Sequence, residues 1–318
     1  MESLYLRLSV TERCNLRCVY CRPGMHDTEV EHGTNAGLAD REWLDLIEAV
    51  ADVAPLAKVR LTGGEPLLRP GLHRLVAGLR EALPETTLSL TTNGMLLAEL
   101  AGRLRRAGLD SINVSLDGPD QRSLARATGG ARLDRVVRGV EAAREQGFSR
   151  LKINAVLLRS VNGDRLERLV ALAAGLGCEL RFIELMPLGV ARAIYHRESL
   201  SAPEALDRIS RRYPVLERLD RVGTATRYRL RLDEGRDTVV GFITPVSDPF
   251  CDACNRIRLD ARGRLLCCLR REHDGVDLAA PLRQGGAAAV APLVREALEA
   301  KNLPQPGWPR RAMVAIGG

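Results

Sequence analysis

The chain has 318 residues and a formal net charge of +7, and it contains no apolar run near 18 residues and no basic-then-apolar leader. The sequence therefore predicts a cytoplasmic protein with one large α/β domain or two smaller ones, and it predicts neither a membrane span nor secretion. The charge does not indicate a nucleic-acid partner, because 44 of the 47 basic residues are Arg spread along the whole chain and only 11 residues are aromatic. A modest positive field equally suits a small polyanionic substrate.

Short apolar strands alternate with helical patterns from Leu4 to about Met186. We expect strands at 4–10, 58–63, 87–93, 111–117, 151–158 and 179–186, and helices at 40–53, 72–83, 95–107, 133–146 and 164–176. Six β/α units in a row imply a parallel sheet, and such units can curl into a partial, three-quarter barrel. The predicted fold is therefore α/β, with a partial β/α barrel over residues 1–188.

A C-terminal region over residues 189–318 is expected to close this barrel. It contains two predicted strands at 226–232 and 238–244, a second cysteine group, and a helix at 292–300. Residues 26–39 are polar and aperiodic, which predicts a loop and leaves open whether it closes as a lid.

Six of the eight cysteines fall in two groups with the spacing of metal ligands. The groups are Cys14-x3-Cys18-x2-Cys21 and Cys251-x2-Cys254-x13-Cys268. In a reducing compartment such groups indicate metal binding more than disulfides. Three thiolates leave one iron of a four-iron cluster open to a substrate or cofactor. The alternatives are half a zinc site or buried thiols for the first group, and a zinc ribbon completed by Cys267 for the second. The remaining cysteines, Cys178 and Cys267, are predicted to be buried packing residues unless Cys267 completes such a zinc site.

Further candidate residues lie where the predicted strands end. They are Gly63-Gly64-Glu65-Pro66, Thr91-Thr92-Asn93-Gly94, Ser115-Leu116-Asp117 and Met186-Pro187. Ligands of parallel sheets gather at the carboxyl ends of the strands, so these segments predict one common site. The carboxylates Glu65, Asp117 and Glu184 would allow acid/base catalysis, but no histidine joins them.

With Tyr20 before its last cysteine, the first group resembles the signature of the radical S-adenosylmethionine superfamily, and residues 63–66 resemble its GGEP motif. The second group, with Asn255-Arg256-Ile257-Arg258 after its first two cysteines and a terminal Gly317-Gly318, is similar to the GTP 3′,8-cyclase family of molybdenum cofactor biosynthesis. The resemblance covers nearly the whole chain. The segment after Pro187 departs from it by lacking a tryptophan, and Arg270 stands where Phe is common, which leaves room for a paralogue that uses another nucleotide.

The resemblance implies two [4Fe-4S] clusters, one held by Cys14, Cys18 and Cys21 and the other by Cys251, Cys254 and Cys268. It implies that S-adenosylmethionine binds the open iron of the first cluster and that GTP binds the open iron of the second. The implied S-adenosylmethionine contacts are Tyr20, Gly64, Ser115 and Met186. The implied GTP contacts are Arg7, Arg60, Thr91, Lys152, Arg256 and Arg258, of which Arg256 and Arg258 would also be catalytic. Arg181 is a further candidate for a GTP contact.

The implied activity is that of a lyase that converts GTP to 3′,8-cyclo-7,8-dihydro-GTP, the first step of molybdenum cofactor biosynthesis. The implied partners are a flavodoxin- or ferredoxin-type reductant, a downstream cyclic pyranopterin monophosphate synthase and a second copy in a homodimer, with no nucleic acid or membrane. The terminal Gly317-Gly318 would reach into the active site, where residues without side chains can thread a narrow channel. The rival hypotheses are a radical enzyme acting on a peptide or another nucleotide, and a metal-containing protein that only binds nucleic acid.

Overall fold

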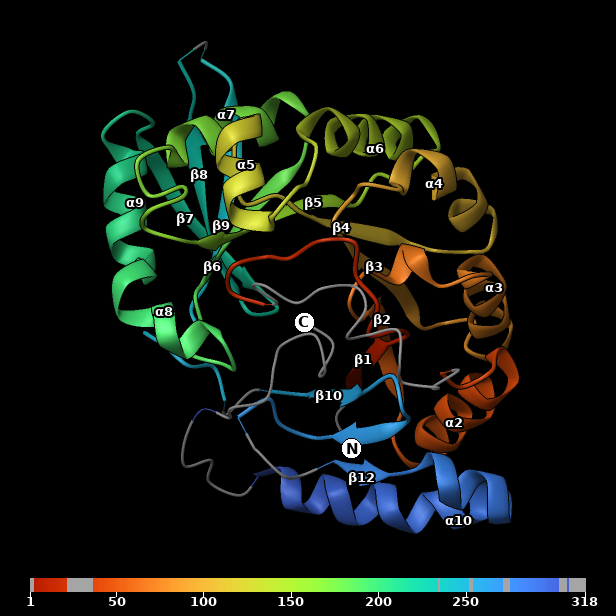
Figure 1. The fold of residues 1–318 in the computed structure, drawn as a ribbon. Coiled ribbons are helices and arrows are strands. Elements are labelled where there is room, and N and C mark those ends of the chain that lie inside the picture. Colours follow the sequence, from red (N-terminus) through yellow and green to blue (C-terminus); the bar gives the residue numbers. More distant parts are fainter. Residues whose placement is uncertain are drawn as a thin grey trace.

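One sheet runs through the whole molecule. The computed structural model describes residues 3–21, 37–233, 235–251, 254–270, 275–302 and 308. Within them, a 12-stranded sheet has the strand order β12-β11-β10-β1-β2-β3-β4-β5-β6-β9-β8-β7. The sheet is strongly curved, and helices cover its outer side (Figure 1). None of the helices in these residues combines the length and hydropathy needed to cross a membrane.

The six strands predicted for the first part of the chain are confirmed. They are β1 (Leu4–Ser9), β2 (Leu56–Thr62), β3 (Thr87–Thr92), β4 (Ser111–Ser115), β5 (Leu151–Leu157) and β6 (Glu179–Glu184). Neighbouring strands in this series pair in parallel. The predicted helices correspond to α2 (Asp40–Val53), α3 (Leu72–Ala82), α4 (Leu97–Arg106), α6 (Leu133–Glu145) and α7 (Leu166–Gly175). The chain therefore has an α/β fold built on parallel strands.

Shorter elements were not predicted. The turn after β2 contains the 3-10 helix η1 (Pro66–Leu68), and the two-turn helix α5 (Gln121–Thr128) follows β4. In α5 the side chain of Asp120 accepts a hydrogen bond from the Ser123 amide, and the helix stops at Gly129, whose φ is 69°. Two turns are too short for a helical period to stand out, so the capping residues were the available signal. The helices α8 (Ala191–Glu198) and α9 (Ala202–Ser210) follow β6.

The second half of the chain extends both ends of the sheet. The antiparallel strands β7 (Val215–Val222), β8 (Ala225–Arg231) and β9 (Asp237–Ile243) follow α9, and β9 pairs in parallel with β6. At the other end lie β10 (Arg256–Leu259), β11 (Arg264–Leu266) and β12 (Val276–Asp277), with β10 parallel to β1. The helix expected at 292–300 is only the second half of α10 (Ala279–Glu299), which is broken at Gly286 and leads into η2 (Ala300–Asn302).

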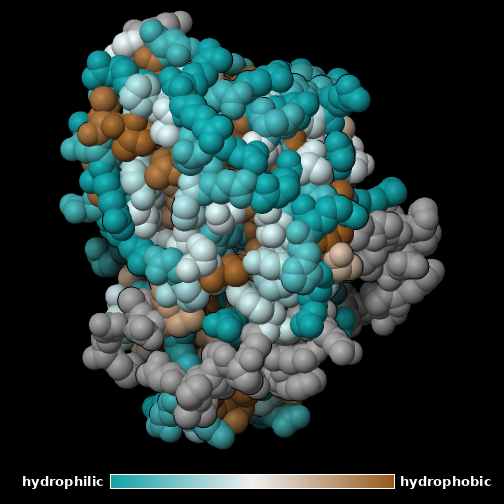
Figure 2. All heavy atoms as spheres, turned by 90° about the vertical axis from the view of Figure 1, so that its left-hand side faces the viewer, coloured by the Kyte–Doolittle hydropathy of each residue, from teal (hydrophilic) through white to brown (hydrophobic). Residues whose placement is uncertain are grey.

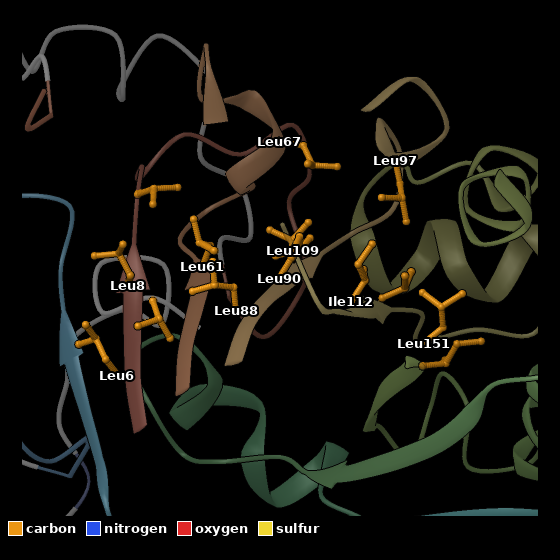
Figure 3. Close-up of a cluster of buried hydrophobic side chains, with 14 of the residues drawn as sticks. Leu6, Leu8, Leu61, Leu67, Leu88, Leu90, Leu97, Leu109, Ile112 and Leu151 are labelled. Atoms are coloured by element: carbon orange, nitrogen blue, oxygen red, sulfur yellow. The ribbon is translucent and has the colours of Figure 1, made fainter. Parts of the chain in front are cut away.

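Side chains alternate along the strands between an apolar outer face and a polar inner face. On β1, Leu4, Leu6 and Leu8 are buried, and Leu6 lies level with Val59 of β2 and Ile257 of β10. Figure 3 shows such leucines gathered from β1, β2 and β3 with residues of the neighbouring elements. The hydrophobic core therefore lies between the sheet and its helices, and the inner face is left for polar side chains.

The outside of the helix layer is hydrophilic. In the view of Figure 2, which faces the left-hand side of Figure 1, most of the described surface is coloured as hydrophilic and apolar atoms form small scattered patches. This is the usual pattern for a helix layer that buries one face and hydrates the other.

Candidate functional site

The first cysteine group lies in the loop that follows β1, and the turn that follows β2 is hydrogen-bonded to it. The Gly64 amide donates to the Thr11 carbonyl at 2.8 Å, and the Glu65 amide donates to the Arg13 carbonyl at 2.7 Å. A Cβ on Gly64 would lie 2.2 Å from the Arg13 oxygen. We expected this glycine to admit a ligand, and in the structure the close neighbour is the backbone of the cysteine loop itself.

Glu65 connects the turn after β2 to the end of β3. Its buried carboxylate accepts hydrogen bonds from the Leu67 amide, the Thr92 hydroxyl and the Asn93 amide at 2.7–3.0 Å. Burial raises the pKa of Glu65 to about 7, although these three hydrogen bonds favour the charged form. The Asn93 side-chain amide also donates to Asn15 in the cysteine loop at 2.8 Å. The loops after β1, β2 and β3 thus form one hydrogen-bonded unit.

Asp117, just after β4, fixes the end of the cysteine loop. It accepts hydrogen bonds from the Tyr20 hydroxyl and the Val156 amide, both at 2.8 Å. Burial raises its pKa to about 6, and burial together with Asp117 raises the pKa of Tyr20 well above its usual range. The predicted S-adenosylmethionine residue Tyr20 is therefore held in one orientation by a buried carboxylate.

Glu184 plays the same part at the end of β6. Its two oxygens accept hydrogen bonds from the Ala202 amide, the Ser247 amide and the Ser247 hydroxyl. Glu65, Asp117 and Glu184 were candidates for acid/base chemistry from sequence. In the structure each binds loop donors, which makes them structural anchors of the site.

The three cysteines of the first loop are half-buried. The Cys21 amide donates to the Cys18 carbonyl, and Arg17 and Val19 donate to the carbonyls of Thr128 and Ala127 at the end of α5. The pKa of the Cys18 thiol is raised well above its usual range, first by burial and then by Asp117 and the two other thiols. The three sulfurs are thus close enough to influence one another.

Among the described residues, no three His, Cys, Asp or Glu side chains converge as they would around a single metal ion. In a four-iron cluster each thiolate binds a different iron, so its ligands need not meet at one point. Three thiols at that spacing, without a fourth ligand converging on them among the described residues, therefore fit an iron-sulfur cluster better than a zinc ion.

Seven cations lie on the inner face of the sheet, which we call the cationic face. It consists of Arg7, Lys58, Arg60, Lys152, Arg181, Arg256 and Arg258. The strand register brings them together, because Arg7 on β1 lies level with Arg60 on β2 and with Arg258 on β10. Lys58 was not among the predicted contacts. It precedes Arg60 by two residues, so the strand period alone would have placed it on this face.

Arg60 and Tyr5 form the centre of the cationic face. Arg60 is 5% exposed, and its guanidinium donates to the Tyr5 hydroxyl, to the Leu90 carbonyl and to the predicted GTP residue Thr91. Burial alone would raise the pKa of Tyr5, but Arg60, Arg7 and Lys58 outweigh it and lower this pKa to about 8. The lowered pKa of Tyr5 follows from the positive charge that Arg60, Arg7 and Lys58 place around it.

The cations themselves are crowded. Burial, followed by the charge of Arg60, lowers the pKa of Lys58 to about 8. Burial and Arg181 lower the pKa of Lys152, although Glu179 lies 3.5 Å from its ammonium group. Glu179 also accepts a hydrogen bond from Arg181 at 2.6 Å, so one carboxylate serves two cations. The cationic face therefore has an excess of partly desolvated positive charge, which a polyanion would relieve.

The second cysteine group adjoins the cationic face. Cys254 and Cys268 are half-buried and Cys251 is exposed, and the Cys254 amide donates to the Cys251 carbonyl at 3.1 Å. The Lys301 ammonium lies 3.9 Å from the Cys254 sulfur and donates to the Cys267 carbonyl at 3.1 Å. Burial would raise the pKa of Cys254, but Arg256 and Lys301 lower it, which favours the thiolate.

The other cysteines and the remaining predicted residues have plainer surroundings. Cys178 and Cys267 are 4% and 5% exposed within the main hydrophobic core, as expected for packing residues. Ser115 and Met186 are half-buried at or just after the ends of β4 and β6. Most of the 26–39 loop and the terminal Gly317-Gly318 lie outside the described residues.

Comparison with known proteins is consistent with this arrangement. The sequence profile of the Radical SAM superfamily matches residues 8–173, and the profile described as Molybdenum Cofactor Synthesis C matches residues 178–305. The chain is 38% identical to the GTP 3′,8-cyclase of Pelotomaculum thermopropionicum, with 100% of this chain and 98% of that protein covered. It is 40% identical to GTP 3′,8-cyclase 1 of Pseudomonas aeruginosa, with 88% and 83% covered.

A solved structure shows the same fold at low identity. The crystal structure of Streptococcus suis SuiB bound to S-adenosylmethionine superimposes with a TM-score of 0.64 and 14% identity, over 87% of this chain and 64% of that chain. The chain therefore has the α/β fold of radical S-adenosylmethionine proteins. The two profiles and the full-length identities show that it belongs to the radical S-adenosylmethionine superfamily and, within it, to the GTP 3′,8-cyclase family.

Proposed function

We propose that this protein is a GTP 3′,8-cyclase, which converts GTP to 3′,8-cyclo-7,8-dihydro-GTP in the first step of molybdenum cofactor biosynthesis. The observation that carries the proposal is the cationic face, which lies on the same sheet face from β10 to β6 and adjoins the second cysteine group. A nucleoside triphosphate brings a flexible polyanion and a flat base. The triphosphate matches the excess of buried cations, and the base would lie toward the cysteines.

The first three thiols, Cys14, Cys18 and Cys21, would hold a [4Fe-4S] cluster. When bound and reduced, that cluster supplies the electron for cleavage of S-adenosylmethionine, which starts hydrogen removal from the ribose of the substrate. The residues proposed to contact S-adenosylmethionine are Tyr20, Gly64, Ser115 and Met186. The interlocked loops after β1, β2 and β3 support this role, because their hydrogen bonds fix the position of the cysteine loop that would hold the cluster.

Cys251, Cys254 and Cys268 would hold a second [4Fe-4S] cluster. One observation supports an iron-sulfur site here over a zinc ribbon. Cys267, which a zinc site would need as its fourth ligand, has its side chain in the hydrophobic core. Arg256 and Lys301 favour the thiolate form of Cys254, which either kind of metal site requires.

Arg7, Arg60, Thr91, Lys152, Arg256 and Arg258 would bind GTP, and we add Lys58 and Arg181. Arg60 would be oriented for this role by Tyr5 and Thr91, since its guanidinium already donates to both. Arg256 and Arg258 would position the nucleotide between the two clusters, because β10 bears both of them two and four residues after Cys254.

We further propose that residues 1–188 form a partial barrel of six β/α units and that residues 189–318 close it and carry the second cluster. The protein would work in the cytoplasm with a flavodoxin- or ferredoxin-type reductant and would pass its product to a cyclic pyranopterin monophosphate synthase. The terminal Gly317-Gly318 would enter the active site.

Anaerobic reconstitution with iron and sulfide tests the proposal. Reduced protein with S-adenosylmethionine is assayed with GTP, with ATP or with no nucleotide, and 5′-deoxyadenosine and the cyclised nucleotide are measured. We expect about eight iron atoms per chain from two four-iron clusters and a rise in 5′-deoxyadenosine with GTP only. Production that ignores GTP, or iron that saturates near four per chain, would contradict the proposal.

A further inference from the structure

Tyr5 lies in the middle of the cationic face, although it is not a cation itself. The strand register places it level with Lys58 on β2 and with Arg256 on β10. The Lys58 ammonium lies 5.4 Å from the centre of the Tyr5 ring, and the central carbon of the Arg60 guanidinium lies 6.0 Å from it. A ligand that binds these cations therefore comes close to the Tyr5 hydroxyl.

Among the described residues, the charged groups that face Tyr5 from the packed strands are positive. They are Arg7 on β1, Lys58 and Arg60 on β2, and Arg256 and Arg258 on β10. The carboxylate of Glu179, farther along the sheet, is already shared by Lys152 and Arg181. The Tyr5 hydroxyl is therefore a group that can balance some of this positive charge by losing its proton.

The hydroxyl oxygen of Tyr5 is held by guanidinium groups. Arg60 donates a hydrogen bond to it, and Arg7 is hydrogen-bonded to it as well. A guanidinium donates and never accepts, so neither partner can take the hydroxyl hydrogen. Protonated Tyr5 therefore has a hydrogen to offer to an acceptor that enters the site. Ionised Tyr5 has none, and its negative charge repels an incoming anion.

We propose that Tyr5 is a further contact of the triphosphate, and that it donates its hydroxyl hydrogen to a phosphate oxygen while Arg60 and Arg7 donate to its own oxygen. This inference rests on the proposed function, because it places a nucleotide on the cationic face. Each guanidinium has five N–H groups, so both can hold Tyr5 and the phosphate together. Binding to ionised Tyr5 takes up one proton from water, which goes to the phenolate oxygen.

This contact makes binding depend on pH. The surrounding cations lower the pKa of Tyr5 to about 8, and a bound polyanion would raise it again by about 1–3 units. Affinity for the polyanion should therefore be highest below about pH 8 and fall as the pH rises through this value. Lys58, whose pKa is also lowered to about 8, changes affinity in the same direction by losing its charge. A test must separate these two groups.

The ultraviolet absorbance of tyrosinate follows Tyr5 directly. Reconstituted protein is titrated anaerobically from about pH 6 to about pH 10. One component should ionise near pH 8, Tyr5→Phe should lose it, and Tyr228→Phe, whose ring packs against Phe242, should keep it. Inorganic tripolyphosphate, a probe without base or ribose, should move this component upward by about 1–3 units, also in the Lys58→Arg variant. Absence of the component, or a component that tripolyphosphate does not move, overturns the proposal.

Binding of tripolyphosphate gives a second measurement. It is compared at pH 7 and pH 9 in Lys58→Arg and in Lys58→Arg with Tyr5→Phe, because arginine does not titrate in this range. We expect affinity to fall about five- to tenfold between the two pH values when Tyr5 is present. Without the hydroxyl, binding at pH 7 should be about tenfold weaker and should change less with pH. Equal pH dependence in the two proteins overturns the proposal, and circular dichroism checks that both are folded.

The choice of probe separates this inference from the proposed function. If tripolyphosphate behaves as expected but GTP does not raise 5′-deoxyadenosine production, the proposed function is wrong and the anion contact of Tyr5 stands. If GTP is cyclised but neither GTP nor tripolyphosphate moves the Tyr5 titration, the function stands and the role of Tyr5 is wrong.

Discussion

The two faces of the central sheet obey different rules, although they are made by alternate residues of the same strands. On β5, Leu151 and Ile153 face the helices and are buried in the core, while Lys152 between them faces inward. The outer face is complete, because its apolar side chains cover one another. The inner face is incomplete, because it gathers seven cations and burial lowers the pKa of several of them. The apolar outer face stabilises the fold, and the cationic inner face favours the binding of an anion.

The largest expected effect is in the cysteine loop that follows β1. Cys18→Ala removes one of the three thiolates proposed to hold the first cluster. We expect the loss of about four iron atoms per chain and the loss of all 5′-deoxyadenosine production, while the second cluster remains. Iron analysis and product assays on the reconstituted variant measure both. Full iron content in this variant would falsify the ligand assignment.

Two adjacent residues of β5 separate the faces most directly. Ile153→Ala should lower the free energy of unfolding by about 2–5 kcal/mol, because it leaves a cavity in the core, and should leave GTP affinity unchanged. Lys152→Met should weaken GTP binding roughly tenfold, or about 1.4 kcal/mol, and should leave the free energy of unfolding no lower than in the wild type. Stability is kept because the substitution reduces the repulsion among the cations and Glu179 still has Arg181 as a partner.

Urea unfolding and equilibrium nucleotide binding on the same preparations test this pair of variants. Lys152→Arg, which keeps the charge, is the matched control and should bind GTP more tightly than Lys152→Met. If Ile153→Ala weakened GTP binding as much as Lys152→Met does, the separation of the two faces would be wrong.

Glu65 gives a smaller effect with a defined pH dependence. Its folded pKa of about 7 lies above its ordinary value of 4.5, so the folded state disfavours the charged form. Its contribution to stability is therefore greatest below about pH 4.5 and falls as the pH rises through about 7, by up to about 3 kcal/mol. Glu65→Gln removes this dependence, because an amide does not titrate.

Thermal unfolding of wild type and Glu65→Gln between pH 5 and pH 8 measures the difference. The variant should show a flatter pH profile. It should also lose about 1–3 kcal/mol at low pH, because the Gln side chain cannot accept all three hydrogen bonds of Glu65. Parallel pH profiles for the two proteins would show that Glu65 does not titrate in this range.

The smallest effect concerns Lys301. Its ammonium lies 3.9 Å from the Cys254 sulfur, and a cation beside a ligand stabilises the reduced, more negative state of a cluster. Lys301→Met should lower the reduction potential of the second cluster by some tens of millivolts. A redox titration followed by electron paramagnetic resonance measures it. Arg295→Met, at an exposed position on α10, the helix that leads into η2 and Lys301, should have no effect.

The parallel strands and their helices could be predicted because local pattern determines them. Alternation in residues 151–157 and the 3.6-residue period in residues 40–53 are visible without any partner. The cysteine groups were visible for the same reason. The strands β10, β11 and β12 could not be predicted, since they have two to four residues each and owe their strand form to distant partners.

The structural roles of the buried carboxylates also could not be predicted from the sequence. In the sequence, these carboxylates look like acid/base residues: Glu65, Asp117 and Glu184. Their structural role follows from the hydrogen-bond donors that they bind, and these donors lie up to 63 residues away along the chain. The placement of the second cysteine group beside the cationic face is a further case. It depends on the pairing of Tyr5 with Arg256 and of Arg7 with Arg258, which no local period can indicate.

That pairing of β1 with β10 has a consequence for biosynthesis. β1 leaves the ribosome before β2 and pairs with it soon afterwards, but its other edge stays open until residues 256–259 have been made. For most of synthesis, the strand that leads into the first cysteine group has one bare edge in a hydrophobic sheet. Nascent chains expose such edges to aggregation, and only the arrival of β10 protects this one. Residues 256–259 are therefore needed to complete the strand pairing of β1, although they are made long after it.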